Sequence, residues 1–387
     1  MESQILLWEA NINNQYWNQT MKTFSFITTV AVLLGFAALA QADGHSEHHD
    51  ATPTMRLSAE FNEIGNPADV LTVKATAPQA LESGEVRVRV LAAPINPSDL
   101  LQIAGQYGVA AVLPAKAGSE GVGRVVEVAP EATYLKEGQL VLILGGGTWS
   151  DEVVAPEAGF LPLPDMGPLA PEMIEQLGMS VVNPVTALLM LNDFVELSEG
   201  QWIVQSAANS AVGGYVIQLA KQRGIKTVNV VRREGLAEQL YAKGADVVLI
   251  DGPDLAQQIA EATGGEPVAL ALDPVGGETY TRLTTSLAYG GTIVAYGMLS
   301  GQPATLNTGM AIFKDIRNRS FWLAKWYESA TLAEKQAAFG KIIPLIASGV
   351  LTADVDSRFA VSDITAAVTR AAQDGRNGKV LVVPASE

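Results

Sequence analysis

Apolar and polar positions alternate along the chain in two different ways. Before residue 155, short apolar runs are separated by glycine and proline, and residues 85–92 alternate valine with charged side chains. That pattern is typical of the short strands of a small β barrel. From residue 171 onward, helical spacing alternates with short β-branched runs. The second pattern predicts βαβ units with right-handed crossovers, and therefore a parallel sheet covered by helices.

The expected elements follow from these two periodicities. Strands are predicted over residues 55–61, 68–75, 85–92, 116–128, 138–144, 149–154, 202–205, 227–231, 247–250, 268–273, 291–296 and 380–384. A short helix that breaks at Gly105 is predicted within residues 95–107, and further helices are predicted over residues 173–179, 183–193, 212–223, 235–243, 254–263, 277–287, 333–348 and 364–374. Ser98 or Asp99 is expected to cap the first helix, and the last strand is expected to return to the barrel.

The chain is organised around residues 201–233, which have the pattern of strand, turn, helix and strand. A helix that begins beside the ends of parallel strands presents free amides, which favour a phosphate group. The turn departs from the GxGxxG pattern, because Ala207, Asn209 and Ala211 stand where glycines are common. By itself, this turn is weak evidence for a dinucleotide site.

Two arginines, Arg232 and Arg233, follow the second strand of this unit. A carboxylate at that position normally holds the ribose 2′-hydroxyl of NADH. Guanidinium groups suit a 2′-phosphate instead, so the sequence predicts NADPH as the cofactor. The alternative is a solvated arginine pair after a surface strand.

Composition limits the kinds of chemistry available. A length of 387 residues favours two domains, and a net charge of −16 argues against a nucleic-acid partner. The chain has no cysteine, and its three histidines, His45, His48 and His49, lie in one polar stretch near the N-terminus. We therefore expect no metal site in the body of the protein, and no histidine-based catalytic triad. The histidine stretch is either a weak metal site or a solvated tail.

The N-terminal region has a separate pattern. Residues 21–42 combine Lys22, an apolar run and a small-residue site ending at Ala42, which is the layout of a secretory signal peptide. We expect residues 1–20 to be an upstream extension, residues 43–54 to be a linker, and the mature protein to be exported to the periplasm. An uncleaved membrane anchor and a cytoplasmic location without processing remain alternatives.

Several longer motifs go beyond periodicity. They are NPSDLLQIAGQYG from residue 96, GSEGVGRVVEV from 118, NPVTALLML from 183, QSAANSAVGGYVIQLAK from 205, TVNVVRR from 227 and FWLAKW from 321. Together they resemble the medium-chain dehydrogenase/reductase superfamily, and within it the zinc-free, mitochondrial-type trans-2-enoyl-thioester reductases. The resemblance implies an α/β fold with a GroES-like β-barrel catalytic domain and a Rossmann doubly wound parallel-sheet domain. We expect the catalytic domain over residues 55–175, completed by 330–387, and the NADP-binding domain over 176–329.

The resemblance also implies an activity: transfer of hydride from NADPH to the β carbon of an enoyl thioester, with Tyr107 assisting at the enolate oxygen. Such a reaction builds negative charge on that oxygen, which calls for a positioned donor and later for a proton. A phenol can serve both needs. The alternative for Tyr107 is packing at the barrel rim.

The implied cofactor contacts carry over by position. Near the nicotinamide they are Asn183, Tyr296, Gly297, Met298, Leu299, Phe321, Trp322 and Leu323. At the diphosphate they are Asn209, Ser210, Ala211 and Val212, and at the 2′-phosphate Arg232 and Arg233. Lys379 matches a late lysine at the cofactor, whereas Glu234 stands where relatives often have a further arginine. Ordinary core or dimer packing is the alternative for Phe321 and Trp322.

The sequence is compatible with three functions: an NADPH-dependent enoyl-thioester reductase, an NADPH:quinone or enone reductase, and an exported nucleotide-binding protein without turnover. The apolar stretch over residues 291–326 is expected to supply strand material at a sheet edge. An exposed edge is often covered by a second copy of the chain, so a homodimer is expected.

Overall fold

The computed structural model describes residues 54–384. The predicted upstream extension, signal peptide and histidine stretch therefore lie outside the described residues. Within residues 54–384 no single helix is long and apolar enough to cross a membrane, and only one bent pair of helices, α4 (Pro171–Gly178) and α5 (Asn183–Asn192), reaches that length together.

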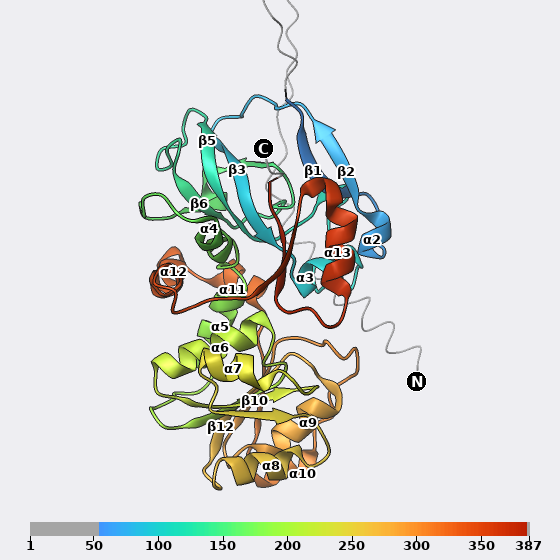
Figure 1. Cartoon of the computed structure of the whole chain (residues 1–387), viewed down its shortest axis with the longest axis vertical. Helices are drawn as coiled ribbons and strands as arrows, with labels where there is room; N and C mark the ends of the chain where they lie inside the picture. Colours follow the sequence, from blue (N-terminus) through green and yellow to red (C-terminus); the bar gives the residue numbers. More distant parts are fainter. Residues whose placement is uncertain (1–53, 385–387) are drawn as a thin grey trace, which may run out of the picture. The chain divides into compact units, whose positions relative to one another are not determined.

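The lobe that the sequence predicts to be catalytic, and which we call the catalytic lobe, is built on two mainly antiparallel sheets (Figure 1). Its strands are β1 (Arg56–Phe61), β2 (Thr72–Thr76), β3 (Glu85–Pro94), β4 (Ala115–Lys116), β5 (Gly121–Val128), β6 (Leu140–Ile143), β7 (Glu152–Pro156), β8 (Phe160–Pro162), β15 (Val355–Phe359) and β16 (Lys379–Val382). The smaller sheet has the order β2-β1-β4, and the larger has the order β15-β16-β3-β5-β6-β8, with β7 paired to β3. The final strand, β16, pairs antiparallel with β3, which confirms its predicted return to the barrel.

Helices close this lobe. They are α2 (Pro67–Val70), α3 (Pro97–Ile103), α4, α12 (Leu332–Ala347) and α13 (Ile364–Ala372), with short 3₁₀ turns at Glu157–Gly159 and Val361–Asp363. The alternation in β3 buries Val86, Val88 and Val90 in a core shared with α13, because successive side chains on a strand point to opposite faces.

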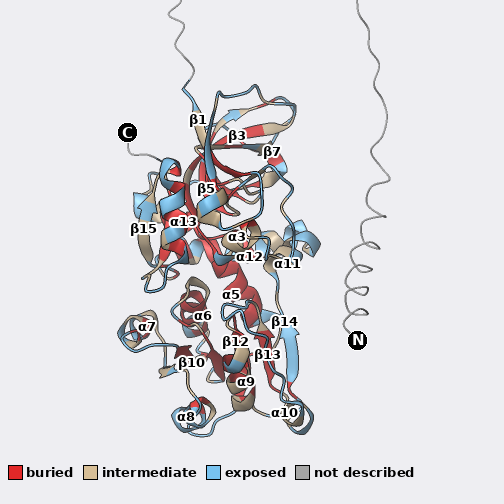
Figure 2. Ribbon diagram, turned by 90° about the vertical axis from the view of Figure 1, so that its right-hand side faces the viewer, coloured by how far each residue is buried: buried red, intermediate tan, exposed pale blue. Residues whose placement is uncertain are grey.

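The lobe that the sequence predicts to bind the nucleotide, and which we call the nucleotide-binding lobe, is built on a six-stranded parallel sheet with the order β11-β10-β9-β12-β13-β14. Its strands are β9 (Trp202–Gln205), β10 (Lys226–Val231), β11 (Val247–Ile250), β12 (Val268–Asp273), β13 (Thr292–Ala295) and β14 (Arg317–Ser320). Its helices are α5, α6 (Ala211–Gln222), α7 (Ala237–Lys243), α8 (Leu255–Ala262), α9 (Gly277–Ser286), α10 (Thr308–Phe313) and α11 (Leu323–Ser329). Burial concentrates in α5 and the central strands, whereas the edge strand β14 is exposed along its length (Figure 2). The predicted α/β fold with a barrel lobe and a Rossmann-type lobe is confirmed.

Some local predictions are wrong, and their causes are local. Residues 67–70 are helical rather than extended, because Asn66 caps them and Pro67 occupies the first helical position. The N-cap of α3 is Asn96, not Ser98 or Asp99; Asp99 instead accepts a hydrogen bond from the Asn96 amide at 2.7 Å. Within the stretch 291–326 that was expected as edge-strand material, residues 317–320 form the edge strand β14, whereas residues 323–326 belong to α11. The elements α10, β8 and β15 were not predicted.

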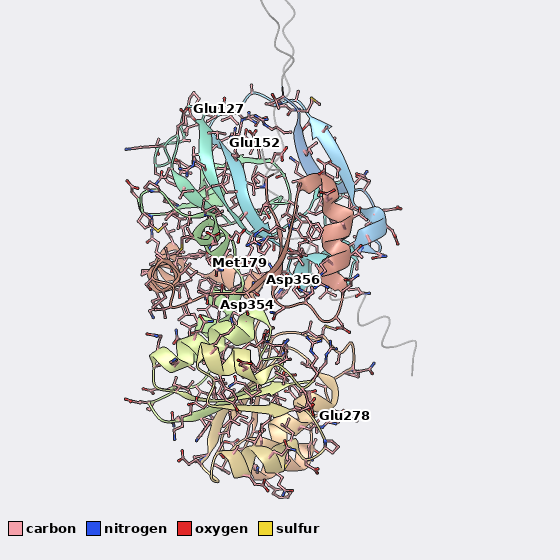
Figure 3. The ribbon with its side chains drawn as sticks, viewed as in Figure 1. Glu127, Glu152, Met179, Glu278, Asp354 and Asp356 are labelled. Carbon is pink, nitrogen blue, oxygen red and sulfur yellow. The ribbon has the colours of Figure 1, made fainter. Side chains whose placement is uncertain are left out.

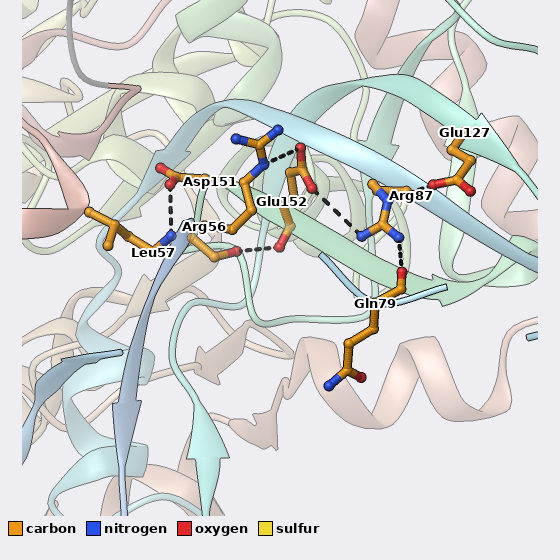
Figure 4. Close-up of polar contacts among 8 residues, drawn as sticks. Arg56, Leu57, Gln79, Arg87, Glu127, Asp151 and Glu152 are labelled. Atoms are coloured by element: carbon orange, nitrogen blue, oxygen red, sulfur yellow. Dashed lines mark hydrogen bonds and ion pairs between the residues drawn. The ribbon is translucent and has the colours of Figure 1, made fainter. Parts of the chain in front are cut away.

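The barrel wall holds an ionic network (Figure 4). The side chain of Glu152 is nearly buried between two guanidinium groups, with 2.8 Å to Arg56 Nε and 3.7 Å to Arg87 Nη1. Arg87 also donates to Glu127 at 2.8 Å. These partners come from β1, β3, β5 and β7, so the network ties four strands together.

Candidate active site

The turn after β9 prepares the N-terminus of α6. Ser210 caps the helix, its Oγ accepting from the Gly213 amide at 3.1 Å. The first amides of a helix have no acceptor within it, so those of Ala211 and Val212 remain available for a ligand. Ala207 has φ +47°, a left-handed conformation in which a glycine would be usual. The turn therefore adopts, without a glycine, the left-handed conformation that a glycine would usually supply there.

A buried carboxylate, that of Asp273 at the end of β12, holds the start of this turn by hydrogen bonds. It accepts hydrogen bonds from the Ser206 hydroxyl and from the amides of Val275 (3.2 Å) and Gly276 (2.8 Å). Burial raises the pKa of Asp273, while the hydrogen bond from Ser206 opposes that shift. Asp273 thus joins the ends of β9 and β12, where ligands bind in open parallel sheets.

The two predicted 2′-phosphate arginines lie at the end of β10, and both are exposed. Arg232 pairs with Asp374, a residue of the loop between α13 and β16 in the other lobe. Arg233 lies beside the same loop, since a Cβ on Gly375 would be 3.7 Å from its Nη1. Arg232 therefore already holds an anion, a carboxylate of the protein.

Asn183 and Lys379 belong to a buried polar network. Asn96 Oδ1 accepts from Asn183 Nδ2 at 3.0 Å and also from Lys379 Nζ, and Asn96 Nδ2 donates to Glu120 Oε1 at 2.8 Å. Asp99 adds a second carboxylate. All five side chains belong to buried residues, and they come from α3, the loop before β5, α5 and β16. The predicted roles of Asn183 and Lys379 at the cofactor remain predictions, because the contacts that these side chains make are with the other members of the network.

Glu120 also fixes the start of α5. Its Oε2 accepts from the amides of Val181 (2.9 Å) and Val182 (2.7 Å), just before the helix begins. A negative group at this end of a helix is stabilised by the helix dipole. The network therefore anchors α5 to the barrel.

The ionisable members of the network have shifted pKa values. Burial raises the pKa of Glu120 to about 7, although the charge of Lys379 and the hydrogen bond from Asn96 oppose that shift. Burial lowers the pKa of Lys379 to about 8 against the opposing charges of Glu120 and Asp99. Burial also raises the pKa of Asp99.

Tyr107 lies in the loop after α3 and meets Trp322 of the other lobe. The indole Nε1 donates to the Tyr107 hydroxyl at 2.7 Å, and the two rings pack edge to face with centroids 5.7 Å apart. Trp322 is 37% exposed, so this pair lies at an accessible surface. The pair leaves little room beside it, because a Cβ on Gly108 would be 2.9 Å from the Trp322 ring.

The remaining nicotinamide candidates follow β13 and β14, in two loops and, for Leu323, at the start of α11. The Tyr296 hydroxyl is buried, whereas Gly297, Met298 and Leu299 are exposed. Burial raises the pKa of Tyr296, and the charge of Asp273 adds to that shift. The Phe321 amide donates to Ala295 O at 2.9 Å, which joins the two loops. Phe321 and Leu323 are partly buried against the main core.

A hollow of about 360 Å³ lies beside the Tyr107 loop, because residues before and after Tyr107 in the sequence line it, including Gln102, Ala110 and Val112. Ser119, before β5, and residues 144–147, after β6, complete its lining. Across residues 54–384 there is no group of three or more histidine, cysteine, aspartate or glutamate side chains that would hold a metal ion.

Sequence reasoning missed four residues of this region: Asn96, Glu120, Asp273 and Asp374. Asn96 and Glu120 stand within the NPSD and GSEG motifs, and an acidic residue in an apolar, glycine-rich stretch was a usable sign of burial. Nothing in the sequence brings Asp374 to Arg232, since 142 positions separate them.

Comparisons with known proteins agree with this architecture. Residues 82–165 match the alcohol dehydrogenase GroES-like domain, and residues 211–338 match the zinc-binding dehydrogenase family. The mitochondrial enoyl-[acyl-carrier-protein] reductase of Rattus norvegicus is 39% identical over 310 residues, which cover 78% of this chain and 82% of the relative.

Solved structures share the fold. Etr1p, in a complex with NADP and crotonyl-CoA, has a TM-score of 0.76 and 27% identity, covering 85% of this chain and 99% of that one. A quinone oxidoreductase from Pseudomonas syringae has a TM-score of 0.75 and 28% identity, covering 85% of this chain and 100% of that one.

The predicted export is wrong. The curated relatives are named as mitochondrial enoyl reductases, which does not fit a periplasmic protein, and the residues that suggested export lie outside the described part of the chain. The relative's identity and coverage, together with the two matched domains, show the family. The chain belongs to the medium-chain dehydrogenase/reductase superfamily, in the group of mitochondrial-type enoyl reductases.

Proposed function

We propose that the protein is an NADPH-dependent reductase of trans-2-enoyl thioesters, with Tyr107 assisting at the thioester carbonyl. The observation that carries this proposal is the hydrogen bond from Trp322 Nε1 to the Tyr107 hydroxyl, which joins a barrel loop to the nucleotide-binding lobe. The family supports it, because its relatives are named as enoyl-[acyl-carrier-protein] reductases and a neighbouring structure holds NADP and crotonyl-CoA.

The hydrogen bond gives the tyrosine a defined polarity. A hydroxyl has one proton to donate and two lone pairs to accept with, and the indole N–H occupies a lone pair. The tyrosine proton therefore stays available for a carbonyl oxygen, and the incoming hydrogen bond polarises it further. Such a donor stabilises the negative charge that develops on the enolate oxygen.

The residues present fit a dinucleotide. Ser210 leaves the first amides of α6 available, and Arg232 with Arg233 supplies cationic donors at the end of β10. NADPH supplies the hydride when it is bound. The chain's own contribution is to hold the phosphates at one end and to place a hydroxyl donor at the other.

Reduction of a quinone or enone is the second candidate, because the Pseudomonas syringae quinone oxidoreductase shares this fold and the Tyr107–Trp322 pair is accessible. The deciding experiment follows NADPH oxidation at 340 nm with crotonyl-CoA, longer enoyl-CoA thioesters and quinones. We expect turnover with the thioesters. Turnover with quinones alone would favour the second candidate, and none with any acceptor would favour a nucleotide-binding protein without turnover.

We further propose a homodimer formed through β14. This strand ends the parallel sheet, all four of its residues are exposed, and the neighbouring helix α10 exposes Ile312 (72%) and Phe313 (82%). An open strand edge beside apolar side chains favours pairing with a second copy. Light scattering at micromolar concentration should give twice the chain mass, and Phe313→Asp should shift it toward one chain.

A further inference from the structure

The ion pair between Arg232 and Asp374 joins the two lobes at the predicted 2′-phosphate site. Arg232 follows β10 in the nucleotide-binding lobe, and Asp374 lies between α13 and β16 in the catalytic lobe. Their side chains are 73% and 83% exposed. A ligand from solvent can therefore reach both partners of the pair.

The loop that carries Asp374 is held in place by other contacts. Arg376 donates to Gln373 O at 3.2 Å and to Gly378 O at 3.3 Å, so it spans the base of the loop. The Asn377 amide donates to Asp356 Oδ1 at 2.9 Å. Asp354 and Asp356 lie near the level where the lobes meet (Figure 3). The position of Asp374 is thus set by the loop rather than by the ion pair alone.

The local charges favour an anion at this point. Arg232 lowers the pKa of Asp374, first through their hydrogen bond and then through its charge, and Arg233 and Arg376 add to the shift. One carboxylate therefore lies among three guanidinium groups in a chain whose net charge is −16. A phosphate dianion would use the same donors and would bind them more strongly than a carboxylate does.

We propose that Asp374 is a specificity-determining residue, whose carboxylate occupies Arg232 in the free protein and must yield it to the 2′-phosphate of the cofactor. The inference rests on the proposed NADPH site. Asp374 then weakens binding of 2′-phosphorylated nucleotides and leaves nucleotides without that phosphate unaffected. Removing the carboxylate should increase the preference for the phosphorylated form.

A second ion pair between the lobes provides a matched control. Lys243, at the end of α7, pairs with Asp354 at 3.0 Å, and Asp354 is likewise partly exposed in a loop of the catalytic lobe. Asp354→Asn removes an interlobe carboxylate without freeing a predicted 2′-phosphate arginine. It therefore separates a general loosening of the lobes from an effect at Arg232.

The test is calorimetric titration with adenosine 2′,5′-bisphosphate and with 5′-AMP, which requires no turnover. Asp374→Asn should raise the affinity for the bisphosphate by about two- to fivefold, which corresponds to the strength of an exposed ion pair, and leave the affinity for 5′-AMP unchanged. Asp354→Asn should not alter the ratio of the two affinities. The gain from Asp374→Asn should shrink when Arg232 is already alanine, because its main partner is then absent.

The outcomes separate this inference from the proposed function. Arg232→Ala should weaken the binding of the bisphosphate at least several-fold. If it does so, but Asp374→Asn leaves the affinity for the bisphosphate unchanged or lowers it, the inference is overturned and the NADPH site stands. If Arg232→Ala does not weaken the bisphosphate, the assignment of the arginine to the 2′-phosphate is overturned, and the inference with it. An equal gain for both nucleotides with Asp374→Asn would also overturn it.

Discussion

The protein has two polar clusters at which its lobes meet, and they differ in how their members are satisfied. In the buried network of Asn96, Asp99, Glu120, Asn183 and Lys379, the side chains bind one another and all of the residues are buried. In the arginine cluster of Arg232, Arg233, Arg376 and Asp374, the central ion pair is more than two-thirds exposed on both sides.

This difference separates two kinds of role. A buried charge whose partner is removed stays desolvated, so substitution in the buried network should act on stability and on its pH dependence. An exposed ion pair contributes little to stability and exchanges readily for a ligand of the same charge. Substitution in the arginine cluster should therefore act on nucleotide affinity. Both clusters include residues that the sequence assigns to the cofactor, so the contrast is open to experiment.

The largest expected effect on stability is that of Lys379→Met. The variant leaves the carboxylates of Glu120 and Asp99 buried without their cation, which should lower the free energy of unfolding by about 3–5 kcal/mol. Urea denaturation of the variant measures this loss, with Lys136→Met, at an exposed lysine, as the control. A loss no larger than that of the control would show that the network does not depend on its cation.

Tyr107→Phe should have the next largest effect, on catalysis alone. It keeps the ring that packs against Trp322 and removes the hydroxyl, so single-turnover reduction of crotonyl-CoA should slow by about 10²- to 10³-fold. NADPH affinity, measured by fluorescence, should hardly change, because the phosphates are held in the other lobe. An unchanged rate would make Tyr107 a packing residue, and a parallel loss of affinity would point to damage beyond the hydroxyl.

Arg233→Ala, in the exposed arginine cluster, should lower the affinity for NADPH and leave the stability of the protein unchanged. One lost charge-assisted hydrogen bond to the 2′-phosphate costs about 1.5–3 kcal/mol, so the Michaelis constant for NADPH should rise about tenfold or more. That for NADH should change little, and so should the midpoint of urea unfolding. Equal losses with both cofactors would mean that Arg233 does not face a 2′-phosphate.

Sequence periodicity predicts the regular parts of the fold well. The strands β9, β11 and β12 begin and end at the predicted residues, because each is a short β-branched run bounded by polar or glycine-rich turns. Helix α11 was missed because its apolar residues fit a strand equally well when they are read without their neighbours. Capping by Asn66 and Asn96 was also missed, although each is followed by a proline, which is favoured at the first position of a helix.

The site was predictable only where one motif contains it. The turn at Asn209 to Val212 and the arginines after β10 belong to one βαβ unit, so their neighbourhood follows from topology. The buried network and the Arg232–Asp374 pair join segments far apart in the chain. Their contacts depend on the register in which the C-terminal strand β16 pairs with β3, and no local pattern specifies that register.

The last predicted effect is a gradual change with pH, small over any one pH unit, and it identifies the buried network directly. The pKa of Glu120 rises from an ordinary value of 4.5 to about 7 in the folded protein. Between those two values the folded chain binds more protons than the unfolded chain, so this residue makes stability fall as pH rises. The slope is at most about 1.4 kcal/mol per pH unit for one proton. Lys379 acts in the opposite sense between about pH 8 and its ordinary 10.5, where stability should rise with pH.

Glu120→Gln should therefore remove a pH-dependent contribution between about pH 4.5 and 7. Urea denaturation at steps of half a pH unit should show that the wild type loses stability relative to the variant as pH rises through that window. A difference in stability that does not vary with pH does not affect this comparison. The groups that face Glu120 are Asp99, Lys379, Tyr215 and Tyr327. Of these groups, only Asp99 has an ordinary pKa below pH 4.5, and burial raises that pKa. The variant should therefore retain the pH dependence of stability that is due to Asp99. Parallel curves for wild type and variant would mean that Glu120 has an ordinary pKa, and that the buried network is held by hydrogen bonds without a shared proton equilibrium.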